Sequence, residues 1–173
     1  MKSNSIYDLI KPVLIISLLL IIGCAYYNTM FNAFELYEEG NLKIANSKDG
    51  KITPDIKKNF NSAIDKCWSL INVHGDSSDW ADDALLLISK SHYLIEEYGK
   101  ANRFLDQFLK KYPNSELLNE AKIWYAKVLV KSDEDEKALI LLNQMLLNDM
   151  DDELKAEALS SLGSIYYLRK DYN

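Results

Sequence analysis

The chain has 173 residues, of which 27% are charged and 48% hydrophobic, a composition typical of a folded globular protein and not of a disordered one. Its 20 basic and 26 acidic side chains give a net charge of -6 with no basic stripe, which argues against nucleic acid as a partner. Glycine and proline are few, and apolar residues recur mostly at spacings of three and four, so the sequence predicts an all-α fold.

The first residues have the organisation of an export signal. Lys2 and Lys11 flank a short polar start, and residues 13–22 are then apolar except for Ser17. As a helix this run rises only about 15 Å, half of a hydrocarbon core of about 30 Å. A basic start followed by a short apolar run predicts a secretory signal peptide and not a membrane span.

The apolar run ends in Ile21-Ile22-Gly23-Cys24, which resembles the lipobox of bacterial lipoproteins. The resemblance implies that the thiol of Cys24 is diacylated, that residues 1–23 are removed as a signal peptide, and that the new amino terminus is acylated. Two or more acyl chains anchor a protein stably in a membrane. Ala25 after the cysteine implies, by the same resemblance, the periplasmic face of the outer membrane. The alternative is that Cys24 is a buried free thiol in an N-terminal helix.

Loss of residues 1–23 would remove two lysines and one aspartate, so the net charge would move from -6 to -7. A negative body is not attracted to an anionic bilayer, so the lipid on Cys24 would have to hold the protein at the membrane.

The segment 24–54 is predicted to contain the lipidated N-terminus, a first helix and a loop. Tyr27, Met30, Phe31, Phe34 and Tyr37 lie at helical spacing directly after Cys24. They either form the first helix of the folded body or rest partly in the lipid interface.

Residues 55–173 contain an internal repeat of about 37 residues. A shift of 37 aligns Ala84, Ala121 and Ala158. The same shift aligns further small residues, which are predicted to let paired helices cross closely: Ser89 with Ala126 and Gly163, and Ala101 with Ala138. Each unit is therefore predicted to be a helical hairpin that stacks on its neighbours. The predicted N-caps are Asp79, Ser115, Ser132 and Asp151.

These repeats resemble tetratricopeptide repeats. The pattern is carried by Ser89, by Tyr98-Gly99-Lys100-Ala101 and by Tyr112-Pro113-Asn114-Ser115. The run from Glu97 to Ser115 is similar to the lipid-anchored tetratricopeptide proteins of the BamD type (YfiO/ComL), and a period longer than the ordinary 34 residues suits that group. The resemblance covers 55–173 well and the segment before it poorly, and Asp135 replaces an expected tyrosine. It implies an α-solenoid of stacked antiparallel hairpins.

By the repeat, Tyr172 is the counterpart of Tyr98, so the last repeat is expected to be incomplete. An unpaired last helix would expose four apolar side chains, Leu159, Leu162, Ile165 and Tyr166.

No sequence pattern here indicates catalysis, a metal site or a cofactor. His92 falls at a helix position shared with Leu129 and Tyr166 and is predicted to be a packing residue, and His74 a solvated turn residue. Cys67 lies on an apolar helical face and is predicted to be a core residue.

By resemblance, the first helix of each repeat lines a concave surface and forms a groove for a partner. The inward positions recur at i, i+3, i+7 and i+10 and are Asp83, Leu86, Lys90 and Tyr93, then Glu120, Ile123, Lys127 and Val130, then Glu157, Ser160, Ser164 and Tyr167. An acidic row and a basic row would flank an apolar strip that suits an extended peptide or an amphipathic helix. The alternative is a solvated face with intrahelical charge pairs.

Together these patterns predict a non-enzymatic scaffold, lipid-anchored on the periplasmic side of the outer membrane, that binds other envelope proteins or peptides during outer-membrane protein or envelope assembly. One alternative is a repeat lipoprotein associated with the Tol-Pal system and cell division. The other is the non-catalytic N-terminal part of a longer secretion component or enzyme.

Overall fold

A computed structural model describes residues 12, 27–76, 78–148 and 150–169, and its described part contains helices and no strand. The all-α prediction is therefore confirmed for these residues. The helices are 27–46, α2 (Pro54–His74), α3 (Ala81–Leu94), α4 (Tyr98–Lys111), α5 (Leu118–Lys131), α6 (Asp135–Leu146) and α7 (Asp152–Arg169).

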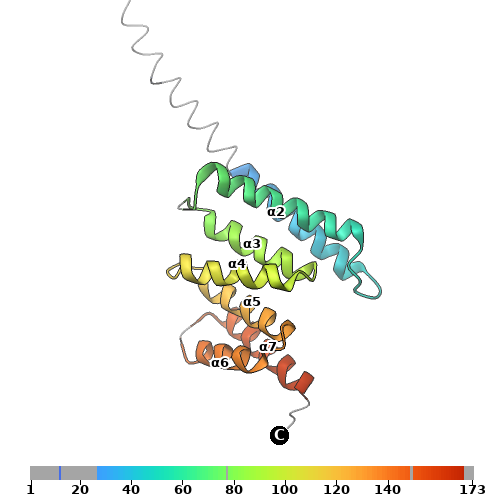
Figure 1. Ribbon diagram of the computed structural model, residues 1–173, viewed down its shortest axis with the longest axis vertical. Helices are drawn as coiled ribbons and strands as arrows, with labels where there is room; N and C mark the ends of the chain where they lie inside the picture. The colour runs from blue at the N-terminus through green and yellow to red at the C-terminus, as the bar shows by residue number, and fades with distance from the viewer. Residues whose placement is uncertain (1–11, 13–26, 77, 149, 170–173) are drawn as a thin grey trace, which may run out of the picture.

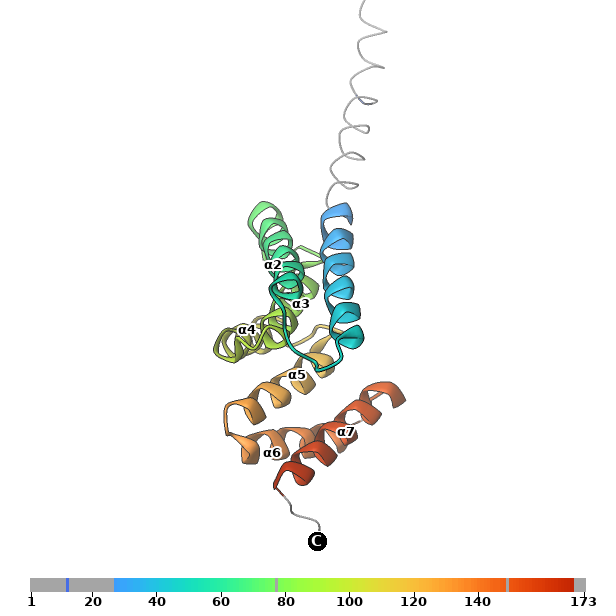
Figure 2. The same ribbon diagram turned by 90° about the vertical axis from the view of Figure 1, so that its right-hand side faces the viewer.

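Consecutive helices pack against one another along the chain (Figure 1). In addition, the backbones of α3 and α5 and of α5 and α7 approach closely, whereas α2 and α4 meet through side chains, with the Trp68 and Phe104 rings 5.4 Å apart. Figure 2 shows α2, α4 and α6 along one side of the molecule, with helix 27–46 and α7 toward the other. The helices α3, α5 and α7 therefore form one continuous surface, which we call the inner surface.

Local sequence explains where α2 begins and ends. The Thr53 hydroxyl accepts a hydrogen bond from the amide of Ile56 at 3.4 Å, and Pro54 occupies the first turn, where its missing amide costs nothing. At the other end Gly75 adopts a φ of 82°, a left-handed conformation that glycine reaches without steric cost.

The turns between α3 and α4 and between α5 and α6 have the same construction. Glu96 and Asp133, 37 residues apart, both have positive φ, at 66° and 59°. The amide that follows each of them donates back into the preceding helix, from Glu97 to the carbonyl of His92 and from Glu134 to that of Leu129, both at 2.9 Å. This is the hydrogen-bond pattern of a helix that ends in a left-handed residue.

Two of the predicted caps receive a backbone amide. Asp151 accepts from the amide of Leu154 at 2.9 Å, as predicted, and Ser115 accepts from the amide of Leu117 at 3.0 Å, just before α5. The prediction for Ser132 is wrong, because its hydroxyl donates to the carbonyl of Val128 at the end of α5 and α6 begins only at Asp135. The start of α3 has no side-chain cap, so the prediction for Asp79 is also wrong.

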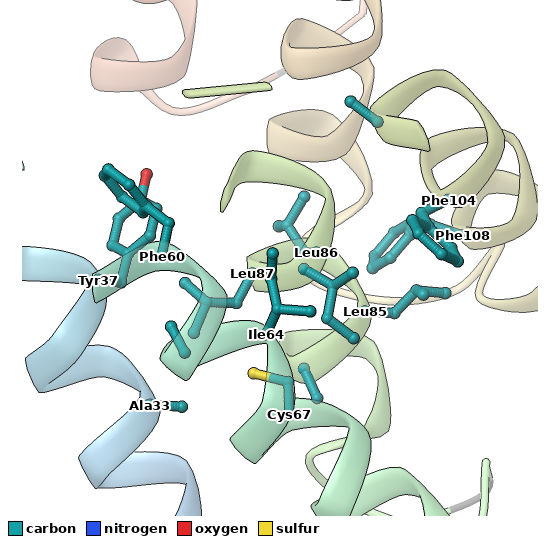
Figure 3. Packing of buried hydrophobic residues seen from close by; sticks show 14 of the residues in the cluster. Ala33, Tyr37, Phe60, Ile64, Cys67, Leu85, Leu86, Leu87, Phe104 and Phe108 are labelled. Carbon is teal, nitrogen blue, oxygen red and sulfur yellow. The ribbon is translucent and has the colours of Figure 1, made fainter. Parts of the chain in front are cut away.

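The buried apolar side chains form two clusters that meet at α5. The larger cluster extends from helix 27–46 to α4 and takes Ala121 and Val128 from α5. The smaller cluster takes Ile123, Ala126 and Leu129 from α5 and continues through α6 and α7. Figure 3 shows the larger cluster, in which the side chain of Cys67 lies among apolar neighbours.

The small residues predicted to allow close helix crossings are fully buried in α3, α4, α5 and α6, at Ser89, Ala101, Ala126 and Ala138. Their counterpart Gly163 in α7 is exposed. The expectation of four exposed side chains on the last helix is only half right. Leu159 and Tyr166 are exposed, but Leu162 and Ile165 are buried in the cluster formed with α5 and α6.

Helix 27–46 packs on α2 through a close contact at Gly40. The ring of Tyr37 meets the ring of Phe60 edge to face, with centroids 5.6 Å apart. A Cβ atom at Gly40 would lie 2.7 Å from the same Phe60 ring, so only glycine fits there. At the far end of the contact Lys43 pairs with Asp55 at 2.6 Å and donates to Asn59 at 3.0 Å.

We expect Gly40→Ala to lower the free energy of unfolding by about 1–2 kcal/mol, because overpacking the buried Phe60 ring outweighs a gain in helix propensity of about 1 kcal/mol. Urea denaturation followed by circular dichroism measures the change. The matched control is Gly163→Ala, a helical position with nothing within 4 Å of the new methyl group, which should raise the free energy of unfolding by up to about 1 kcal/mol. A neutral or stabilising Gly40→Ala would contradict the contact.

Candidate functional site

The predicted groove residues lie on α3, α5 and α7, but the apolar strip between the charged rows is not on the surface. Leu86 is 3% exposed and Ile123 is fully buried, each within one of the two core clusters. The prediction that these two side chains line an open groove is corrected, because neighbouring helices cover the face of α3 and α5 that they occupy.

The charged positions pair between helices. The Lys90 ammonium of α3 lies 2.7 Å from the Glu120 carboxylate of α5, and that of Lys127 of α5 lies 2.6 Å from Glu157 of α7. We call these four residues the inner ladder. The alternative of intrahelical pairs does not describe them, since each pair joins two successive helices of the inner surface.

Aromatic rings enclose the lysines of the inner ladder. Lys90 lies 5.2 Å from the ring centroid of Tyr37 in helix 27–46 and 5.3 Å from that of Trp124 in α5. Lys127 lies 4.2 Å from the same Trp124 ring. At these separations a cation is attracted by the negative face of an aromatic ring. Trp124 therefore sits between two ammonium groups and connects the two ion pairs.

Sequence reasoning missed Trp124 and Tyr37 as members of this surface. A signal for Trp124 was present, because it follows Glu120 by four residues and precedes Lys127 by three, which places all three on one helix face. No comparable signal existed for Tyr37. It comes from a helix outside the repeats and reaches Lys90 only because helix 27–46 packs beside α3.

The charge states of these groups follow from burial and neighbours. Burial opposes the charged form of Lys90, but the attraction of Tyr37 and Glu120 outweighs it and raises the lysine pKa above its usual value. Asp83, at the start of α3, has no basic partner in the inner ladder. Burial, with repulsion from Asp82 as the next cause, raises the pKa of Asp83 to about 6.

A surface cavity of about 310 Å³ lies between α5 and α7, beside the Lys127–Glu157 pair of the inner ladder. We call it the α5/α7 cavity. Its volume is at the lower end of the range of ligand pockets. The apolar part of its lining includes Leu142 and Ile165, and the charged part includes the Lys127–Glu157 pair. Six of the twelve predicted groove residues line it: Tyr93, Lys127, Val130, Glu157, Ser160 and Ser164.

The remaining predicted positions are not part of this cavity. Lys90 and Glu120 form the upper rung of the inner ladder, and Asp83 lies two turns earlier on α3. Tyr167 is on α7 with its side chain exposed, outside the lining. The predicted groove thus has two parts: the Lys90–Glu120 ion pair between α3 and α5, and the α5/α7 cavity.

The other reactive side chains have structural surroundings. His92 is buried, stacks on Phe104 with centroids 5.4 Å apart, and contacts Glu97 at 2.8 Å, while burial lowers its pKa. It packs in the core, as predicted. Cys67 is fully buried, and that burial, with a smaller contribution from Asp83, raises the pKa of its thiol to about 12, which disfavours the reactive thiolate.

Within the part of the chain that the structure describes, no group of three or more His, Cys, Asp or Glu side chains is placed to hold a metal ion. Of the helices in that part, none combines the length and apolar character needed to cross a bilayer. Cys24, the predicted lipidation site, lies outside the described residues.

Comparison of the sequence with known protein families finds no family that matches, and comparison with curated proteins finds no match.

We expect Lys90 and Glu120 to be energetically coupled, because loss of either charge leaves its partner half-buried without a counter-ion. A double-mutant cycle of Lys90→Met and Glu120→Gln, measured by urea denaturation, should give a coupling of about 1–2 kcal/mol. The control cycle is the exposed pair Lys110–Asp106 in α4, for which about 0.3–0.5 kcal/mol is expected. Equal coupling in the two cycles would show that the inner ladder is an ordinary solvated pair.

Proposed function

We propose that this protein is a lipid-anchored, non-enzymatic scaffold on the periplasmic face of the outer membrane, which binds other proteins during outer-membrane protein or envelope assembly, as BamD-type lipoproteins do. The membrane part of the proposal is supported by the basic start, the apolar run 13–22 and the sequence Ile21-Ile22-Gly23-Cys24. A folded helical body that begins within a few residues of Cys24 suits such an anchor.

We further propose that residues 55–173 are tetratricopeptide-like repeats of a solenoid with a period of about 37 residues. Two sets of contacts support this period. The left-handed turn residues Glu96 and Asp133 are separated by 37 positions. The two ion pairs of the inner ladder, Lys90–Glu120 and Lys127–Glu157, are related by the same shift at both partners.

The observation that carries the binding role is the α5/α7 cavity beside the inner ladder. Apolar side chains line part of the cavity, and charges of both signs lie at its side. The cavity therefore suits one apolar side chain of an extended peptide, whose neighbouring charged groups would meet Lys127 and Glu157. Lys127 and Glu157 already neutralise each other, so a partner could exchange its own charges into this pair, and Lys131 adds a second lysine to the same lining. Such an exchange favours a peptide with both an acidic and a basic group over a purely apolar one.

For the anchor, we expect the N-terminal peptide of the protein isolated from membranes to begin at Cys24 and to carry the mass of its acyl chains. Cys24→Ser should abolish both the cleavage and the added mass, because serine lacks the nucleophilic thiol. The control Cys67→Ser should leave the N-terminal peptide unchanged. An intact Gly23–Cys24 bond in the wild-type protein, measured by mass spectrometry, would contradict the lipid anchor.

For the binding site, we expect a photo-crosslinking amino acid at Ser160, in the α5/α7 cavity, to form discrete adducts with envelope proteins in cells. The same probe at Leu147, a highly exposed position outside the cavity, should form none of them. The exchange Lys127→Glu with Glu157→Lys keeps an ion pair and reverses its direction, and it should reduce the Ser160 adducts at least tenfold.

The single change Lys127→Glu tests the same contact with the ion pair broken. Adducts at Ser160 that persist unchanged in both the single and the exchanged variants would contradict charge recognition at this site. Identical adducts at Ser160 and Leu147 would contradict the site itself.

A further inference from the structure

Helix 27–46 has two different apolar faces. Met30, Ala33 and Tyr37 are buried against the body of the protein. On an adjoining face of the same helix Tyr27, Phe31 and Phe34 are 60%, 49% and 37% exposed. Their spacing of four and three residues places these rings on one face of the helix, and we call them the aromatic stripe.

The aromatic stripe is an ordered surface and not a set of separate side chains. The rings of Tyr27 and Phe31 stack with centroids 6.4 Å apart. Tyr27 also meets the ring of Trp80, in the turn before α3, edge to face at 6.1 Å. Helix 27–46 runs antiparallel to α2, as the contacts of Tyr37 with Phe60 and of Lys43 with Asp55 require, so the exposed Val73 at the end of α2 lies at the same end of the molecule.

The chain itself brings this end of the molecule close to any membrane that it engages. Cys24 precedes Tyr27 by three residues, and the apolar run 13–22 ends five residues before it. Three residues of extended chain reach at most about 11 Å. A bilayer that holds residue 24 therefore lies within reach of the aromatic stripe.

The charge pattern limits how much of the helix a bilayer can cover. Within residues 35–39, directly after Phe34, the exposed side chains on and beside the same face are Glu35, Glu38 and Glu39. The stripe from Tyr27 to Phe34 spans about 10 Å of helix axis, and carboxylates follow it. Burial of these carboxylates in lipid would be costly, so only the first two turns of the exposed face suit the lipid interface.

We propose that the aromatic stripe docks into the headgroup region of the bilayer to which the N-terminus is attached. Tyrosine favours this region because its ring is apolar and its hydroxyl is polar. Phenylalanine is among the side chains that interfacial helices bury at the boundary of headgroups and acyl chains. The proposal rests on the membrane attachment proposed above and adds a second contact to it. The side chains of the aromatic stripe carry no charge and the net charge of the protein is negative, so this contact does not depend on anionic lipid.

The docking would fix the orientation of the protein on the membrane. A lipid chain on Cys24 by itself is a single point of attachment, whereas the aromatic stripe adds a second contact that fixes how helix 27–46 meets the surface. That helix packs closely on α2 at Gly40 and Phe60, and its Tyr37 contacts Lys90 of the inner ladder. The inner surface would therefore face a fixed direction relative to the bilayer.

The test places one environment-sensitive nitrobenzoxadiazole probe on the full-length protein through Phe31→Cys. The controls carry the same probe on Leu42→Cys, toward the other end of the same helix, and on Ile140→Cys in α6. Both replace apolar side chains that are at least as exposed as Phe31. The buried Cys67 thiol should not react with the label. Circular dichroism verifies that each labelled protein keeps its helical content, and Phe34→Cys provides a second position in the aromatic stripe.

The labelled proteins are reconstituted into vesicles of phosphatidylethanolamine and phosphatidylglycerol, with and without a lipid that carries a nitroxide quencher on its headgroup. The probe at position 31 should emit at shorter wavelength and be quenched by the nitroxide lipid at least twofold more than the probes at 42 and 140. Equal quenching at the three positions would overturn the docking. A probe at 31 that is shielded from water but not quenched would show that protein covers the aromatic stripe, which also overturns it.

Flotation of the same vesicles separates this proposal from the membrane anchor. Protein that floats with the vesicles while the probe at 31 remains in water contradicts the docking and leaves the anchor intact. Protein that does not float contradicts both.

Discussion

Burial of apolar side chains on two sides of α5 is the constraint on which the rest of this structure depends. A single helical hairpin has no second layer on which to bury its apolar face, and α5 supplies that layer to both halves of the chain. Ala121 and Val128 complete the larger core cluster, while Ile123, Ala126 and Leu129 begin the smaller one. Between the two buried faces of α5, Glu120, Trp124 and Lys127 lie along the inner surface.

The inner ladder is a consequence of that packing. Once α3, α5 and α7 lie side by side, a lysine on one helix reaches a glutamate on the next, and Trp124 fills the space between the two lysines. Tyr37 extends the same contact to helix 27–46. These contacts fill the inner surface around Lys90 and Glu120, whereas the α5/α7 cavity stays open beside the Lys127–Glu157 pair. We therefore place the proposed partner site at α5 and α7.

Helix 27–46 connects the two proposed surfaces of the molecule. One face carries Tyr37 and Gly40 into the body, and the other presents the aromatic stripe. The two interpretations of this segment drawn from the sequence, a first helix of the body or a segment at the lipid surface, are therefore compatible, since each concerns a different face. Under the proposed docking, a membrane contact on one face of this helix would set the direction of the inner surface, because the other face packs on the body.

Helical periodicity and the recurring small residues were readable from the sequence, because spacing along a helix fixes which side chains share a face. Those patterns predicted the all-α fold, the core positions of Cys67 and His92 and the buried Ser89, Ala101, Ala126 and Ala138. They could not tell which neighbour covers a given face. Only the tertiary structure decided three features: the burial of Leu86 and Ile123, the pairing of lysines with the next helix, and the position of Tyr37 beside Lys90. Each of them depends on how separate helices approach one another.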